Sequence, residues 1–207
     1  MSEITSITPQ VKDKTRCNIF VDGRFCCGLT LETTVRNRLK VGQSVTLERL
    51  GQMQFESQKE TAMDKALRHL TATAKTEKQI RDFLSGKGFL PAVCDYVVER
   101  LKGYDFLNDG DYAKTYASFA LKKKGSRLIR MELRAKGIDE RDINGAISEI
   151  SSDDELETAK MLLEKYLRGK EADKITLQKA CRYLLGKGFE YETVKEAIKT
   201  LGELEEE

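Results

Sequence analysis

The sequence has few of the residues from which catalytic and metal centres are built. Its 207 residues contain no tryptophan, one histidine and five cysteines, and the cysteines form no C-x-x-C pair. A zinc site needs several Cys or His ligands at defined spacing, and a general base needs a nucleophile and an orienting partner. The single histidine, His69, stands in the helix-like run AMDKALRHL, where a position on the helix surface explains it. We therefore predict no catalytic residue, no metal and no cofactor, and we expect that the protein is not an enzyme.

Long apolar runs are also missing. No stretch approaches the roughly 18 apolar residues of a membrane span, and the start MSEITSITPQ has no basic segment followed by an apolar one. The odd, scattered cysteines are typical of reduced thiols. These features predict a cytoplasmic protein that does not contact a membrane, and we expect a monomer.

A phosphate-binding loop is the third missing feature. The run LSGKGF, residues 84–89, places a lysine between two glycines. A P-loop needs Ser or Thr after the Gly-Lys pair, so that a hydroxyl reaches the metal, and here Gly88 follows instead. The run therefore does not indicate a nucleotide site.

The same hexamer occurs three times along the chain. It returns in similar form as LRAKGI at 133–138 and as LLGKGF at 184–189, so that the glycine at its fifth position recurs about every 50 residues. Self-similarity at a nearly fixed period is typical of stacked supersecondary units.

Each hexamer matches the end of a helix. A glycine just past a helix adopts a left-handed conformation at little cost, and apolar residues four before and one after it make contact in a Schellman motif. A lysine before each glycine suits the negative end of the helix dipole. The predicted helix stops are Leu84, Gly88 and Phe89, then Leu133, Gly137 and Ile138, then Leu184, Gly188 and Phe189.

Helix starts can be predicted as well, and they give three helices in each repeat. The first helices would open at Thr61, at Asn108 or Asp109, and at Ser152 with Glu155 as its capping-box partner; the middle helices at Thr76 with Gln79, at Ser126 and at Thr176; the third helices at Pro91, at Asp139 and, with a weaker cap, at Glu190. The predicted fold is mainly α, with three tandem three-helix repeats (61–104, 105–150 and 151–203) forming an elongated curved rod, and an acidic tail at 204–207.

The first 60 residues differ from the repeats. Asp22-Gly23 between two short apolar runs is a strong β-hairpin signal, with Phe20 opposite Phe25 and Ile19 opposite Cys26. A short helix over Leu31–Leu39 and another from near Thr46 would follow. We predict a small N-terminal α+β segment at 1–60.

Charge is nearly balanced in total, at +2, but uneven along the chain. Seven cations stand between positions 122 and 136 against one anion, Glu132, and an acidic stretch follows from Asp139 to Glu157. The cations are the candidate binding residues: Lys122, Lys123, Lys124, Arg127, Arg130, Arg134 and Lys136.

Three of these cations would form one face of the second repeat's middle helix. Arg127, Arg130 and Arg134 fall within about 60° on a helical wheel, and we call them the arginine ridge. Such a ridge can bind successive phosphates or carboxylates. We place an apolar face opposite the ridge, and with no aromatic platform beside it we do not expect a dedicated single-strand binder. The apolar face is assigned Leu128, Ile129, Met131, Leu133 and Ala135.

The chain from about residue 61 to 201 resembles the RecX family, bacterial regulators of the RecA recombinase. The resemblance is carried by 67–70 with 79–89, by YDFLND at 104–109 with Tyr112-Ala113, and above all by 125–138; the hairpin segment is similar to an N-terminal extension of some members. It implies a protein that lies in the groove of the RecA–DNA filament and lowers ATP hydrolysis, strand exchange and repressor cleavage in DNA repair and the SOS response. The alternative is a stand-alone DNA-binding helical module, and direct binding of single- or double-stranded DNA stays open with either.

Overall fold

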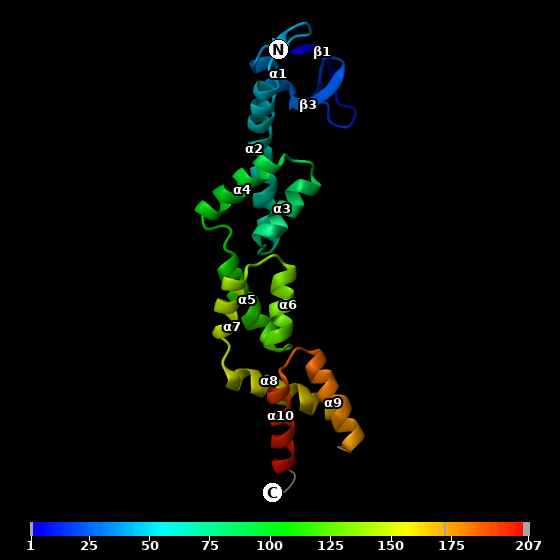
Figure 1. The fold of residues 1–207 in the computed structure, drawn as a ribbon, viewed down its shortest axis with the longest axis vertical. Coiled ribbons are helices and arrows are strands. Elements are labelled where there is room, and N and C mark those ends of the chain that lie inside the picture. The colour runs from blue at the N-terminus through cyan, green and yellow to red at the C-terminus, as the bar shows by residue number, and fades with distance from the viewer. Residues whose placement is uncertain (1, 172, 205–207) are drawn as a thin grey trace. The chain divides into compact units, whose positions relative to one another are not determined.

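A computed structural model describes residues 2–171 and 173–204 of the chain (Figure 1). The predicted mainly α class is confirmed, because helices dominate these residues and the strands among them all lie in the N-terminal segment. The chain divides into two compact units, one of residues 1–73 and 80–106 and the other of residues 74–79 and 107–207. The predicted acidic residues Glu205–Glu207 lie outside the described residues. The elements are β1 (Ser2–Pro9), β2 (Arg16–Val21), β3 (Arg24–Thr30), α1 (Leu31–Arg36), β4 (Ser44–Val45), α2 (Leu47–Ala72), α3 (Glu77–Gly86), α4 (Pro91–Gly103), α5 (Asp109–Leu121), α6 (Ser126–Ala135), α7 (Glu140–Ser148), α8 (Ser152–Leu167), α9 (Lys174–Gly186) and α10 (Tyr191–Leu204).

The N-terminal segment holds an antiparallel sheet of order β3-β2-β1-β4. The predicted hairpin joins β2 to β3, and Asp22 and Gly23 both take positive φ, at 48° and 77°. Phe20 lies opposite Phe25 as predicted, but the pairing of Ile19 with Cys26 is wrong. The register shifts between Ile19 and Phe20, so that Ile19 pairs with Cys27. Cys26 of β3 has no partner in β2 and forms a bulge. Strand β1 was not predicted.

Helix α2 spans the predicted boundary between the N-terminal segment and the first repeat. It begins after Thr46 as expected, but it runs unbroken to Ala72, so the predicted start at Thr61 is wrong. Its first turns place Leu50 and Met53 in the core of the sheet, and its later turns pack against α4. The same helix therefore packs against the N-terminal sheet and against α4. The short helix α1 ends at Arg36, three residues earlier than predicted.

All three predicted helix stops are confirmed. Gly88, Gly137 and Gly188 have φ of 81°, 85° and 90°. The N–H of the following residue donates to the carbonyl oxygen of the leucine five residues before it, at 3.2–3.3 Å, which is the long hydrogen bond of a Schellman motif. The three glycines thus end α3, α6 and α9 in the same way.

The helix starts are confirmed in part. Thr76 and Gln79 form the predicted reciprocal capping box, and Asn108, Asp139 and Pro91 occupy their predicted positions. Three of the predicted N-cap residues lie too close to the C-terminus, because a residue that precedes each of them caps the helix instead. The actual N-caps are Gly125 rather than Ser126, Ser151 rather than Ser152, and Asp173 rather than Thr176.

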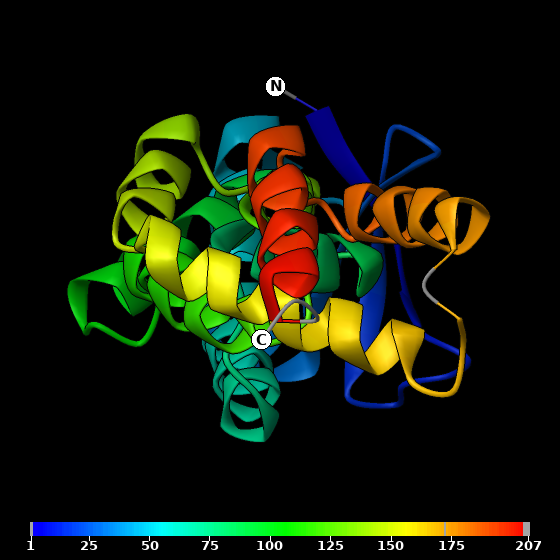
Figure 2. The same cartoon turned by 90° about the horizontal axis from the view of Figure 1, so that it is seen from below.

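We use repeat 2 for α5–α7 and repeat 3 for α8–α10. In repeat 3, α10 crosses α8 while α9 lies to one side (Figure 2). Their shared core contains Leu163, Leu184, Phe189 and Val194. Repeat 2 has its own core, built around Ile129, Leu133, Ile138 and Ile143.

Repeat 2 meets repeat 3 where α6 begins and α9 ends. The Gly125 N–H donates to the Lys187 carbonyl oxygen at 3.0 Å, and the Arg127 N–H donates to the Gly188 carbonyl oxygen at 3.1 Å. The first N–H groups and the last C=O groups of a helix have no partner inside it, so the two ends satisfy one another. A Cβ on Gly188 would lie 2.3 Å from Cβ of Leu128, so this contact requires glycine.

A carboxylate completes this junction. The Ser126 N–H donates to Oε1 of Glu155 at 2.7 Å, an arrangement that suits the positive end of a helix dipole. The predicted capping box of Ser152 and Glu155 is therefore wrong, since Glu155 serves α6 and not its own helix. The start of α3 uses the same device, because the Glu77 N–H donates to Oδ1 of Asp109 at 2.8 Å.

Candidate partner-binding surface

The seven predicted cations all lie on α6 or within four residues of its ends, but they do not act as one group. Helix α6 buries Ile129 and Leu133, and it exposes Arg127 and Arg134 on the opposite side. Arg130 is half-buried at the margin of the ridge. The predicted positions of Met131 and Ala135 on the apolar face are wrong, since both side chains are exposed, that of Met131 to 57%. At 100° per residue Met131 falls about 40° from Arg127, on the side of the ridge.

Helix α7 partly neutralises the ridge. Arg134 donates through Nε and Nη2 to the carboxylate of Glu140, the second bond measuring 3.0 Å. Arg130 lies 3.5 Å from the same carboxylate and donates to Oδ1 of Asn144 at 2.5 Å. The hydrogen bond from Arg134 holds the pKa of Glu140 below its ordinary value. This pairing cannot be inferred from the sequence of α6 alone, because Glu140 belongs to α7.

Arg127 has a second, structural task. Its Nη2 donates to the Leu185 carbonyl oxygen at 2.9 Å, near the end of α9. This residue therefore supports the junction with repeat 3 while its guanidinium stays exposed. Removing it takes away a charge from the ridge and a donor from the junction.

Lys124 and Lys136 belong to a cluster around the one anion of α6. Glu132 accepts from Nζ of Lys124 at 2.5 Å and from the hydroxyl of Tyr116 at 2.7 Å. Nζ of Lys136 lies 5.1 Å from the centre of the Tyr116 ring and 5.7 Å from that of Tyr112. These two lysines are less available to a partner than the sequence suggests.

The Glu132 cluster shifts two pKa values. Burial acts to raise the pKa of Glu132, but the hydrogen bonds from Lys124 and Tyr116 outweigh it, and the pKa is lowered. Burial and the hydrogen bond to Glu132 raise the pKa of Tyr116 to about 12. Both shifts favour the charge states in which the cluster is hydrogen-bonded at neutral pH.

Lys122 and Lys123 are exposed at the start of the loop before α6. Nζ of Lys122 lies 5.5 Å from the centre of the Phe119 ring, and this ring is 69% exposed. The expectation of no aromatic platform concerned the arginine ridge, whereas this ring adjoins the lysine run before α6. Phe119 precedes the lysine run on a different helix, so inspection of α6 alone could not find it. The sequence does place Phe119 seven residues after Tyr112 and three after Tyr116, a spacing that puts the three rings on one side of a helix.

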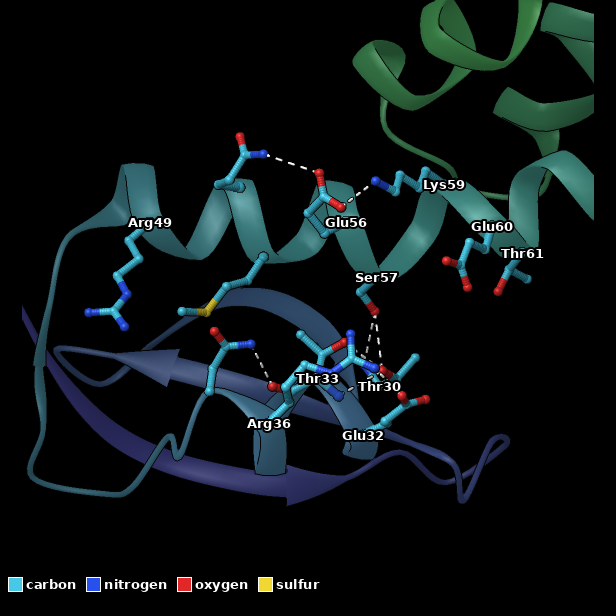
Figure 3. Close-up of a pocket in the computed structure, with 13 residues that line it drawn as sticks. Thr30, Glu32, Thr33, Arg36, Arg49, Glu56, Ser57, Lys59, Glu60 and Thr61 are labelled. Carbon is cyan, nitrogen blue, oxygen red and sulfur yellow. Dashed lines mark hydrogen bonds and ion pairs between the residues drawn. The ribbon is translucent and has the colours of Figure 1, made fainter. Parts of the chain in front are cut away.

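A hollow of about 540 Å³ lies in the N-terminal segment, between α1 and α2 (Figure 3). Figure 3 shows Ser57 of α2 directed toward Thr30. The Thr30 N–H donates to Oγ of Ser57 at 3.2 Å. Glu32 pairs with Arg36, and Glu56 pairs with Lys59. Since opposite charges pair along its walls, no charge of one sign converges there, and we assign no ligand to it.

Among residues 2–171 and 173–204, no group of three or more His, Cys, Asp or Glu side chains is arranged to hold a metal ion. Within the same ranges, no helix has both the length and the apolar character to cross a membrane.

Four family models match most of the chain. Residues 2–46 match the family model of the regulatory protein RecX N-terminal domain. Residues 62–101, 108–147 and 153–198 match the models of the first, second and third three-helix domains of RecX.

Individual relatives agree with the family models. A regulatory protein RecX from Clostridium perfringens is 34% identical over 205 residues, which are 97% of each chain. One from Clostridium botulinum is 32% identical over 203 residues, 96% of each chain. A crystal structure of regulatory protein RecX superposes with a TM-score of 0.66 at 26% identity, covering 96% of this chain and 100% of the other.

Proposed function

Because the chain belongs to the RecX family of regulatory proteins, we propose that it binds the RecA–DNA filament and lowers the activities of RecA. The activities concerned are ATP hydrolysis, strand exchange and the stimulated cleavage of repressors, in the cytoplasm, during DNA repair, recombination and the SOS response. RecA as the partner comes from the family resemblance described above. The protein acts as a binding module without a cofactor.

The exposed cationic side of repeat 2 is the observation that best supports a contact surface. Arg127 and Arg134 of the ridge and the two lysines before Lys124 are exposed on one side and the adjoining loop of this repeat. Arginine binds carboxylates and phosphates through two parallel hydrogen bonds, and a RecA–DNA filament offers both groups. We propose that the ridge with Lys122 and Lys123 makes the main contacts. Lys124 and Lys136 contribute less, because Lys124 pairs with Glu132 and Lys136 lies beside two tyrosine rings.

The proposed mode is binding along the filament groove. Successive three-helix repeats can follow such a groove, since each presents a helix of similar length. Inhibition would then increase in proportion to the ratio of this protein to RecA until the groove is filled. An inhibitor that caps filament ends would act at ratios far below one per several RecA subunits, and that result would contradict groove binding.

The contact surface is tested with the DNA-stimulated ATPase of the cognate RecA. The triple variant R127A/R130A/R134A is expected to lose most of its inhibition while circular dichroism shows an unchanged helix content. The matched control K174A/K179A/R182A removes three exposed cations from α9, the corresponding helix of repeat 3. Its inhibition should stay near the wild-type level.

A second variant separates binding from folding, because Arg127 also supports the junction with α9. Lys122 and Lys123 are exposed, and K122E/K123E should weaken inhibition without lowering the melting temperature. If both the triple variant and K122E/K123E inhibit like the wild type while folded, repeat 2 is not the contact surface.

The ridge also supports a second candidate, a stand-alone DNA-binding helical module. Three arginines at one-turn spacing can bind a duplex backbone with α6 as the contacting helix. Duplex binding without RecA, with an affinity that falls steeply as salt rises, would favour this candidate.

A further inference from the structure

Phe119 is the most exposed aromatic side chain among the described residues. Its exposed fraction is 69%, compared with 60% for Phe25 and 59% for Phe106. A single exposed apolar residue needs no explanation in itself. The surroundings of Phe119 distinguish it.

Cations adjoin the Phe119 ring along the chain. Nζ of Lys122 lies 5.5 Å from the ring centre. Lys123, four residues after Phe119 and just past the end of α5, is exposed. In the described part of the chain, neither lysine forms an ion pair with a carboxylate. Glu132, the one anion of α6, is held by Lys124 and Tyr116. The positive charge beside the ring is therefore available to an external anion.

The ring also continues an aromatic stripe along α5. Tyr112, Tyr116 and Phe119 are spaced by four and then three residues, so they lie on one side of the helix. The two tyrosine rings are nearly parallel, with centres 6.1 Å apart, and both are half-buried. Phe119 is the outermost member of the stripe and the one that a ligand can cover.

An exposed ring next to unpaired lysines matches the requirements of a single-stranded nucleic acid. A base stacks on the ring face, and the lysines neutralise the adjacent phosphates. A base in a duplex has both faces covered by its neighbours and cannot stack in this way. An acidic protein segment would use the lysines but would gain no stacking from the ring.

We propose that Phe119, with Lys122 and Lys123, forms a stacking site for a base of single-stranded nucleic acid. The contact is direct and does not need RecA. Its failure would leave the proposed role of the arginine ridge untouched, and the ridge could fail while this site binds.

The chain's lack of tryptophan makes a direct test possible. In the full-length variant F119W, the indole at position 119 is the only one, and it can stack like the phenyl ring. Titration with an oligothymidylate should quench its fluorescence and reach saturation. A duplex with the same number of phosphates should quench it much less.

Affinity measurements by fluorescence anisotropy complete the test. F119A should bind the oligothymidylate between about fivefold and a hundredfold more weakly than the wild type, which is the range that one base stack contributes. F106A removes another exposed ring and should bind like the wild type. K122Q/K123Q should weaken binding and lower the slope of log affinity against log salt by about 1.4, since each lysine neutralises one phosphate of a single strand.

Three outcomes would overturn the proposal. The first is an unchanged indole signal at saturating oligothymidylate. The second is wild-type affinity of F119L, because leucine keeps the apolar area but has no ring to stack. The third is a loss of affinity of F119A for RecA filaments alone, with oligothymidylate binding intact, which would assign the ring to a protein contact.

Discussion

The middle helices of repeats 2 and 3, α6 and α9, end alike but differ in their starts and faces. Both stop in a Schellman motif with a left-handed glycine. The N-terminus of α6 is bonded to the end of α9 and to Glu155, whereas α9 is capped by its own Asp173. The three ridge arginines fall within about 60°, while Lys174, Lys179 and Arg182 of α9 are spread over about 140°. Equal helix ends thus give the repeats one geometry, and the exposed faces give them different binding surfaces.

The junction between the two repeats can be broken at its glycine. In G188A an alanine must adopt a left-handed backbone conformation. Its Cβ also overlaps the backbone and Cβ of Leu128. We expect a loss of about 2–5 kcal/mol in the free energy of unfolding, from backbone strain and overpacking together. G88A has the same conformation but nothing within 4 Å of its Cβ, so it should lose only about 1–2 kcal/mol.

Urea unfolding followed by circular dichroism measures both losses. Equal destabilisation of G188A and G88A would contradict the requirement for close approach at Gly188. Strain from the left-handed conformation would then account for both glycines.

The positive charge that the arginine ridge offers to a ligand can be increased by removing the carboxylate of Glu140, which pairs with it. E140Q frees Arg134 and Arg130 from their carboxylate. The affinity for a duplex or for heparin should therefore increase, but by no more than about fivefold, because an exposed ion pair is weak. The matched control is E149Q, whose carboxylate pairs with Lys114 in the same repeat. If E140Q and E149Q increase affinity equally, only net charge matters and Glu140 does not compete for the ridge.

The smallest expected effect distinguishes the two repeats by pH. The pKa of Tyr116 is raised from 10.0 to about 12, so its hydroxyl stabilises repeat 2 below about pH 10, and this contribution is lost as the pH rises toward 12. In Y116F the free energy of unfolding should fall less steeply over this range. Y166F, which alters a tyrosine stacked on Tyr183 in repeat 3, should keep the steeper loss. Identical slopes for the wild type and Y116F, measured by urea unfolding at several pH values, would exclude the Tyr116 contribution.

Most of the fold was predictable because helix ends are local. The three Leu, Gly and apolar triplets were recognised as stops, and the structure confirms each one. Errors arose where two adjacent residues could both cap, as at Ser151 and Ser152, or where no residue breaks a helix, as along α2. The bulge that shifts Ile19 to Cys27 was not predictable, because a one-residue slip changes no local preference.

The candidate surface was predictable only as a set of charges. Its seven cations were identified from their order in the chain, but their partners come from other helices. Glu140 of α7 faces the ridge, Tyr116 of α5 shares Glu132, and Phe119 lies beside Lys122. None of these contacts follows from the spacing within α6.

The sequence by itself determined where the helices stop, the number of repeats and the family. These features depend on backbone conformation and helical periodicity, which neighbouring residues specify. The tertiary structure alone decided which cations remain available and which ring stands beside them. Ion pairs and stacking depend on distances between side chains far apart in the chain, and only packing sets those distances.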